Sequence, residues 1–206
     1  MCTSCIDINY NMAINRDETA SIAYGMKLSD EIVDLRNYSS MIDSIVLELE
    51  QNGFEVERND KEIKASKYIE YIFALAEGDT LLKPFEKSIF TKENKFFSKV
   101  YELNANIDLT GYSTTEKEIS LDNEIKELAN INFNLTLPSK AKQTNATNVD
   151  GNNLKWELKY GENNQIYVKY VVADFASIIS VFIAVIVFVT IFAVLFKRKN
   201  DNSVNY

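Results

Sequence analysis

The sequence predicts an α+β fold: an antiparallel sheet of about seven to eight strands with one long helix packed on it, followed by a C-terminal single transmembrane helix. Three observations lead to this prediction. Most of the chain alternates apolar and polar residues with a period of two, which is typical of half-buried strands. One stretch repeats its apolar residues at helical spacing, and one uncharged run near the C-terminus is long enough to cross a bilayer. About 170 residues precede that run, enough for a single hydrophobic core.

The first strand is predicted from Ile6 to Ile14, where apolar residues alternate with aspartate, asparagine and alanine. The polar turn NRDE follows, and a second alternation runs from Ala20 to Leu28. Two alternating runs separated by a short polar segment predict a β-hairpin.

A helix is predicted next, between Ser29 and Gly53. Ser29 or Asp30 is suited to cap its start, and Gly53 is suited to end it. Between these positions, apolar residues recur at helical spacing: Ile32, Leu35, Ile42, Ile45, Val46 and Leu49.

Six further strands are predicted, over residues 54–58, 63–73, 97–109, 131–137, 154–159 and 165–172. Two segments lack the alternation. Residues 75–94 contain Pro84 and predict a loop with a helical turn. Residues 114–130 predict a solvated acidic connector, because their carboxylates are not arranged in an Asp-rich calcium loop.

The C-terminal run from Phe175 to Phe196 carries no charge, and as a helix its residues span roughly 33 Å. Residues 175–196 therefore predict a membrane-spanning helix. Lys197, Arg198 and Lys199 follow it directly. Because positive residues stay on the cytoplasmic side, we expect residues 6–174 outside the membrane and the short basic tail, 197–206, inside.

Charge excludes one class of partner. The chain has a formal charge of −8, and the basic tail contributes +2, so the part before the helix carries −10. No stripe of lysine or arginine alternates with stacking aromatic residues. Nucleic acid is therefore not a predicted partner.

The two cysteines of the chain, Cys2 and Cys5, lie three positions apart at its start. A redox pair usually precedes a helix in a βαβ unit, whereas a strand follows here. A structural zinc site needs four ligands, and the chain has no histidine. Small residues directly before Cys5 match a lipoprotein signal, so residues 1–5 are a candidate remnant of one and Cys5 a candidate lipidation site, although the apolar signal segment is missing. Free terminal cysteines remain the alternative.

The segment INFNLTLPSKAKQTNATNVDGNNLKWELKYG resembles the closing motif of the LppM-type lipoprotein domain, a family of bacterial envelope proteins. That motif runs from an apolar strand to a proline, an asparagine, an Asp-Gly turn and a strand tryptophan. Its elements match Pro138, Asn145, Asp150, Gly151 and Trp156, which are structural rather than catalytic residues.

The start of the chain is similar to the family as well, with a cysteine, a strand, a turn and a helix ending near Gly53. The likeness spans residues 5–172. It implies a bacterial, extracytoplasmic α+β domain that is lipid-anchored in many members through the leading cysteine. It therefore supports Cys5 as the lipidation site, while the missing apolar signal segment departs from the family.

No catalytic, metal or cofactor site is predicted. Without histidine, a Ser-His-Asp triad, a Cys-His pair and the usual zinc hydrolase sites are excluded. The glycines are isolated, so no Gly-rich phosphate loop is present. A carboxylate pair as in glycosidases stays open, because a sequence does not show spatial separation. We expect a protein that is not an enzyme.

The predicted function is that of a single-pass, membrane-anchored protein of the bacterial cell envelope, with the lipid bilayer as partner and a lipid or other amphiphile as candidate ligand. Aromatic residues are candidates to line a cavity under the helix, with ordinary core packing as their alternative role: Tyr24, Tyr68, Tyr71, Phe73, Phe96, Phe97 and Tyr101. The alternative function is a surface interaction or sensory ectodomain. It would work through a partner protein of the envelope, because the cytoplasmic tail is too short for a signalling domain.

Overall fold

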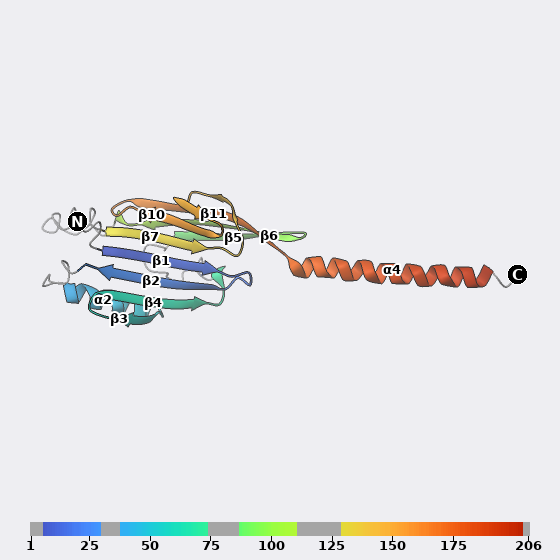
Figure 1. Cartoon of the computed structure of the whole chain (residues 1–206), viewed down its shortest axis with the longest axis horizontal. Coiled ribbons are helices and arrows are strands. Elements are labelled where there is room, and N and C mark those ends of the chain that lie inside the picture. Colours follow the sequence, from blue (N-terminus) through green and yellow to red (C-terminus); the bar gives the residue numbers. More distant parts are fainter. Residues whose placement is uncertain (1–5, 30–37, 74–86, 111–128, 204–206) are drawn as a thin grey trace.

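The computed structural model describes residues 6–29, 38–73, 87–110 and 129–203, and it shows a mostly-sheet α+β domain from which one long helix projects (Figure 1). The elements are, in chain order, β1 (Ile6–Ile14), β2 (Ala20–Leu28), α2 (Tyr38–Gln51), β3 (Glu55–Arg58), β4 (Glu62–Ile69), β5 (Lys87–Lys95), β6 (Ser98–Asp108), β7 (Ala129–Thr136), β8 (Ala141–Thr144), β9 (Asn148–Asp150), β10 (Asn153–Leu158), β11 (Asn163–Ala173) and α4 (Phe175–Ser203).

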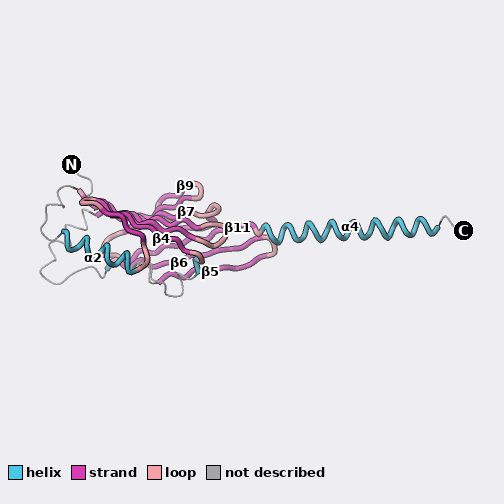
Figure 2. Tube along the Cα trace, turned by 90° about the horizontal axis from the view of Figure 1, so that it is seen from below, coloured by secondary structure: helices cyan, strands magenta, loops and turns pink. Residues whose placement is uncertain are grey.

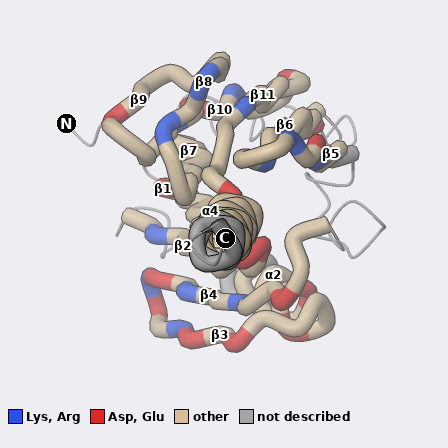
Figure 3. The backbone as a smooth tube through the Cα atoms, turned by 90° about the vertical axis from the view of Figure 1, so that its right-hand side faces the viewer, with Lys and Arg blue, Asp and Glu red and all other residues tan. Residues whose placement is uncertain are grey.

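The strands form two sheets. The larger has seven strands in the order β3-β4-β2-β1-β7-β10-β9, and the smaller has four in the order β5-β6-β11-β8. Neighbouring strands are antiparallel except β1 and β7, which run parallel. Seen along the long axis, the two sheets curve around a shared interior (Figure 3).

Alternate residues of both sheets fill this interior. Along β2 every second side chain from Ala20 to Leu28 is buried, as the alternation predicted. In the smaller sheet Ile107, Ile166 and Val168 are fully buried. These residues belong to one hydrophobic core, and burying each large aliphatic side chain stabilises the fold by about 1.5–3 kcal/mol.

α2 lies beside β3 and β4 and adds Ile42 and Leu49 to the core (Figures 2 and 3). It ends at the predicted glycine. The N–H of Gly53 donates to the Glu50 carbonyl at 2.9 Å, and the N–H of Phe54 donates to the Leu49 carbonyl at 3.0 Å. These two bonds form a Schellman motif, in which the first residue after the helix C-cap adopts a left-handed backbone conformation. Gly53 occupies that position, with a φ of 76°. The first part of the predicted helix, residues 30–37, lies outside the described residues.

The prediction of a single antiparallel sheet of seven to eight strands is wrong, because the structure has two sheets and one of them is mixed. The three strands that were not predicted, β5, β8 and β9, all lie at a sheet edge. β8 and β9 are only four and three residues long and bury none of their side chains, so their sequences carry no alternation to detect. β5 replaces part of the loop predicted over residues 75–94, and its Phe90 is buried whereas its Ile89 is exposed.

Two other predicted segments also end differently. The strand predicted over residues 63–73 ends at Ile69. The acidic connector predicted over residues 114–130 falls outside the described residues up to 128, and its last two residues begin β7.

The parallel pair of β1 and β7 carries a ladder of side-chain hydrogen bonds on the face away from the core. In each rung an asparagine of β7 donates to β1: Asn130 to Asp7 at 3.1 Å, Asn132 to Asn9 at 3.3 Å and Asn134 to Asn11 at 3.0 Å. The ladder fixes the register of two strands whose partner residues are 123 positions apart in the chain.

Replacing Gly53 with alanine should lower the free energy of unfolding by about 1–2 kcal/mol, because a side chain strains left-handed backbone. An added Cβ would meet only the Lys67 side chain, at 3.9 Å, so the effect is conformational. Gly25→Ala is the matched control: its Cβ would lie 4.0 Å from the Asn9 carbonyl and its φ is not positive, so stability should hold or rise. Denaturant unfolding of the full chain in detergent, followed by the fluorescence of its single tryptophan, measures both. Equal losses would contradict the prediction.

Candidate functional site

Three segments meet where the domain passes into α4: the end of β11, the β1–β2 turn and the tip of the β5–β6 hairpin (Figures 1 and 2). A single residue, Asp174, separates β11 from α4. We call this region the helix-entry site and define it by residues 15–19, 92–101 and 173–178.

Asp174 is the N-cap of α4. Its carboxylate accepts a hydrogen bond from the Ser177 hydroxyl at 2.7 Å and one from the Ser177 N–H at 3.4 Å. Its carbonyl accepts the N–H of Ile178 at 3.1 Å. The bonds from Ser177 hold the pKa of Asp174 below its ordinary value. The cap therefore stays negatively charged, which also complements the positive end of the helix dipole.

Two loops fasten this cap to the domain. Ala173 pairs with Ser98 in the register of β11 and β6, and the N–H of Asp174 donates to the carbonyl of Phe97 at 2.9 Å. From the β1–β2 turn, the guanidinium of Arg16 lies over the ring of Phe175, 5.6 Å from its centroid, a cation–π contact. α4 therefore leaves the domain through a braced junction.

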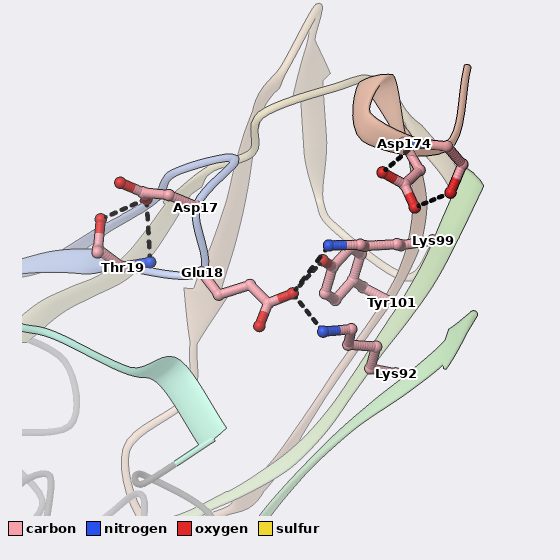
Figure 4. Close-up of polar contacts among 8 residues, drawn as sticks. Asp17, Glu18, Thr19, Lys92, Lys99, Tyr101 and Asp174 are labelled. Carbon is pink, nitrogen blue, oxygen red and sulfur yellow. Dashed lines mark hydrogen bonds and ion pairs between the residues drawn. The ribbon is translucent and has the colours of Figure 1, made fainter. Parts of the chain in front are cut away.

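Glu18 lies at the centre of the polar cluster of this site (Figure 4). Its Oε1 accepts hydrogen bonds from Lys92 Nζ at 2.6 Å and from the Tyr101 hydroxyl at 2.7 Å, and Lys99 Nζ lies 3.8 Å away. The Glu18 side chain is only 13% exposed. Because Glu18 connects strands of the larger sheet, whereas its partners belong to the smaller one, its carboxylate joins the two sheets.

The backbone of Glu18 indicates that this side chain is specifically required. Asn15 and Thr19 close a three-residue loop, and Glu18, its last residue, has a φ of 70°. Such loops usually place glycine there, because left-handed backbone costs other residues about 1–2 kcal/mol. Within the described ranges, Glu18 is the one non-glycine residue with positive φ. The N–H of Ile72 donates to its carbonyl at 2.9 Å and holds this conformation from outside the loop.

The charge state of the cluster follows from its contacts. Burial would raise the pKa of Glu18, but the hydrogen bonds from Lys92 and Tyr101, with the charges of Lys92 and Lys99, outweigh it and hold that pKa below its ordinary value. Burial, and then the bond to Glu18, raise the pKa of Tyr101. Burial also raises the pKa of Tyr170, whose ring stacks on Tyr101 at 5.0 Å. At neutral pH one ionised carboxylate therefore lies beside two neutral phenols.

A row of aromatic rings runs from the surface to this cluster. Tyr71 is exposed and lies 5.1 Å from Phe73, Phe73 lies 4.9 Å from Phe90, and Phe90 lies 6.0 Å from Tyr101, measured between ring centroids. The row bridges the two sheets, because Phe73 follows β4 whereas Phe90 and Tyr101 lie on β5 and β6.

The aromatic residues predicted to line one cavity are divided between core and surface. Tyr24 and Tyr101 are buried and Phe73 is half-buried, whereas the others are exposed: Tyr68, Tyr71, Phe96 and Phe97. Alternation alone did not distinguish the buried rings from the exposed ones. Tyr68 lies near the end of β4 and Tyr71 follows that strand, whereas Phe96 and Phe97 occupy a turn.

Two residues of the LppM-type motif hold the two sheets together elsewhere. Trp156, buried on β10 of the larger sheet, donates its indole N–H to Asn145 Oδ1 at 2.8 Å. The same oxygen accepts the N–H of Tyr167 on β11 at 2.8 Å, and Asn145 Nδ2 donates to the carbonyl of Gln165 at 2.7 Å. Asn145 therefore joins a side chain of one sheet to the backbone of the other.

The other motif residues shape the chain around this contact. Gly151 has a φ of 61° at the first position of the two-residue turn that Asp150 and Asn153 close, which matches a type II′ hairpin. Asp150 also lines a surface hollow of about 240 Å³. Pro138 lies in the bend that follows β7.

The remaining predicted site residues lie near the ends of the chain. Cys5 is outside the described residues. The apolar part of α4, Phe175–Leu195, has a mean hydropathy of 3.2, is long enough to cross a membrane and is not covered by the rest of the described structure. Lys197, Arg198 and Lys199 follow in the last turns of the same helix, which continues to Ser203.

The cluster of Glu18, Lys92 and Tyr101 was not predicted from the sequence. The available signal was the turn NRDE itself, which joins two strong strand patterns without the glycine that so short a loop usually requires. Lys92 could not be placed, because β5 was not recognised as a strand, and Tyr101 lies on a predicted strand whose distance from the turn in space the sequence does not show.

Residues 81–200 match the model of a protein family of unknown function, DUF3153. The match covers more than half of the chain, and the chain belongs to this family. A search of curated proteins finds no match.

A search of solved structures gives the second comparison. The chain is similar to the folded domain of LppM from Mycobacterium tuberculosis, determined by NMR, with a TM-score of 0.50 and 12% sequence identity. The alignment covers 84% of this chain and 94% of that one. At this identity the likeness shows the fold alone, and it confirms the LppM-like domain predicted from the closing motif.

Replacing Glu18 with glutamine should lower the free energy of unfolding by about 1–3 kcal/mol at neutral pH, because a shielded, charge-assisted hydrogen-bond cluster is lost. Since the pKa of Glu18 is lowered in the folded protein, its contribution is complete above the ordinary value of 4.5 and disappears as the pH falls through the lowered pKa. Denaturant unfolding at several pH values measures the difference between variant and native chain.

Glu157→Gln is the matched control, because Glu157 is 62% exposed and its partner Lys155 lies 3.6 Å away. An exposed pair contributes about 0–1 kcal/mol, so this variant should stay close to the native chain. A Glu18→Gln effect that is equally small, or one that does not shrink in acid, would contradict the role assigned to Glu18.

Replacing Asn145 with alanine should destabilise the chain by about 2–3 kcal/mol, because the buried indole N–H of Trp156 loses its acceptor. A double-mutant cycle with Trp156→Phe should give a coupling of about 1 kcal/mol. Thermal unfolding followed by far-UV circular dichroism is suitable, since the single tryptophan is removed. Additive effects of the two substitutions would show that the bond contributes nothing.

Proposed function

We propose that this chain is a single-pass membrane protein of the bacterial cell envelope whose LppM-like domain is extracytoplasmic, acts by binding rather than catalysis, and takes lipid or another amphiphile as its ligand. One observation carries the proposal: the uncovered apolar helix α4 continues the last strand of the domain after a single residue. An apolar helix of that length is stable when lipid surrounds it, whereas water disfavours it.

The orientation rests on charge. Lys197, Arg198 and Lys199 follow the apolar part of α4, and Asp174 precedes it. Positive residues near a span favour the cytoplasmic side, so the domain lies outside. An acidic domain of −10 suits an exported domain that must stay soluble beside the bilayer. Lipidation of Cys5 would add a second anchor.

The aromatic row from Tyr71 to Tyr101 supports an amphiphile as ligand. It begins at the exposed ring of Tyr71 and ends between the two sheets at the buried ring of Tyr101, which belongs to the helix-entry site. Lys92 Nζ lies over the Phe73 ring, 5.9 Å from its centroid, so apolar rings and a charged group lie side by side, which matches the two parts of a lipid.

The orientation is tested by labelling intact cells with a maleimide that does not cross membranes. In a chain with Cys2 and Cys5 replaced by serine, a cysteine at Asn148, exposed on β9, should react in intact cells. A cysteine at Ser203 should react only after permeabilisation. The reverse pattern would place the domain inside, and release of the chain by alkaline extraction would exclude a membrane span.

The ligand is tested by native mass spectrometry of the full chain purified from its own membranes. We expect a co-purifying lipid, and Tyr71→Ser should reduce its occupancy, whereas Tyr68→Ser, at an exposed tyrosine outside the aromatic row, should not. A native chain without bound lipid would contradict the proposed ligand and favour a protein partner. The same spectrum would show a lipid-modified Cys5 by its mass.

A further inference from the structure

The tip of the β5–β6 hairpin carries two adjacent phenylalanines that its turn does not require. Lys95 pairs with Ser98, so Phe96 and Phe97 are the two residues of the turn. Two-residue hairpin turns favour glycine or asparagine at positive φ, and neither phenylalanine has a positive φ. Local backbone geometry therefore gives no reason for two phenyl rings here.

Packing within the domain gives no reason either. Phe96 is 76% exposed and Phe97 is 46% exposed, and their rings meet edge to face with centroids 4.6 Å apart. Fully burying one such ring is worth about 1.5–3 kcal/mol, so two rings left in water forgo a substantial stabilisation. An apolar partner outside the domain would recover it.

The position of the tip identifies that partner. The carbonyl of Phe97 accepts the N–H of Asp174, the residue directly before the apolar part of α4. The hairpin also reaches further toward α4 than the β1–β2 turn does (Figure 1). With α4 across a bilayer, the two rings lie at the level where headgroups meet hydrocarbon, the level at which aromatic side chains are enriched in membrane proteins.

Charge is complementary to the same partner. Residues 90–100 contain three lysines and one glutamate, a net charge of +2, whereas the whole part of the chain before α4 carries −10. Lys92 and Lys99 are engaged with Glu18, whereas Lys95, directly before the two rings, has a side chain that is 55% exposed. A lysine beside apolar rings suits an interface in which anionic headgroups lie above hydrocarbon, because its long side chain can reach the phosphates.

We propose that the Phe96–Phe97 tip inserts into the interface of the bilayer that α4 spans, and so gives the domain a second contact with lipid. The proposal rests on the proposed function in one respect, namely that α4 crosses the membrane. The tip and α4 then fix the face that the domain turns toward the bilayer, since two points of attachment restrict rotation about the helix axis.

The test uses depth-dependent quenching in the full chain. With Cys2 and Cys5 replaced by serine, one cysteine at Asn94, exposed beside the tip, carries an environment-sensitive fluorophore. The chain is reconstituted into vesicles of phosphatidylethanolamine and phosphatidylglycerol that contain lipid with a nitroxide at a shallow or a deep acyl carbon. A second chain carries the fluorophore at Phe188, within the apolar part of α4.

We expect the shallow nitroxide to quench the Asn94 probe and the deep one to quench the Phe188 probe. Phe96→Ser with Phe97→Ser should abolish quenching at Asn94. Ile89→Ser, the matched control at an exposed apolar residue further along the same strand, should leave it unchanged.

Two other results would overturn the proposal and are distinguishable from failure of the proposed function. Quenching at Phe188 without quenching at Asn94 would leave α4 as an anchor but place the tip in water. Quenching at Asn94 that survives the loss of both phenylalanines would show that nearness to α4 alone brings the tip to the lipid. Absence of quenching at Phe188 would instead contradict the membrane span itself, and the inserted tip with it.

Discussion

The parallel pairing of β1 with β7 is the constraint on which the rest of the architecture depends. On one side of this pair lie β2, β4 and β3 from the first part of the chain, and on the other lie β10 and β9 from the last part. Pairing β1 with β7 closes a loop of more than a hundred residues, because partner residues are 123 positions apart in the chain. Closing that loop costs more conformational entropy than forming the short hairpins on either side of the pair. The pair is stabilised by the common core on one face and by the asparagine ladder on the other, and with it the two halves of the chain become one sheet.

The two sheets are then held to each other by contacts of different chemistry. Asn145, an exposed residue, and Trp156, a buried one, form a neutral contact within the domain, whereas Glu18 forms an ionic one at the end where α4 begins. Each contact restricts its residue. The Asn145 side chain must bond backbone groups of Gln165 and Tyr167 as well as Trp156, and Glu18 must adopt a left-handed backbone conformation that is strained for a residue other than glycine. Side chains retained under such restrictions make the relative placement of the sheets more specific than apolar packing alone would.

Sequence patterns recovered the parts of the fold that local physics determines. The hairpin from Ile6 to Leu28 and the end of α2 at Gly53 follow from alternation and from a glycine at positive φ, and both are confirmed. The edge strands, such as β8 with its sequence AKQT, have no alternation to detect. The Glu18 cluster could not be predicted for a different reason. Lys92 and Tyr101 lie 74 and 83 positions from Glu18 in the chain, and a single sequence does not show which distant residues come together.

The one-residue connection between β11 and α4 also bears on the affinity for lipid that the domain would need in order to be oriented at a membrane. A flexible linker would dilute any membrane-facing surface of the domain over the volume that the linker allows it to explore. Here Asp174 caps α4 and donates its N–H to Phe97, so with α4 in a bilayer, as proposed, that surface would be held at the lipid at a high effective concentration. In that arrangement each lipid contact would be an intramolecular event, and an affinity too low to recruit a soluble protein would be sufficient to orient a tethered one.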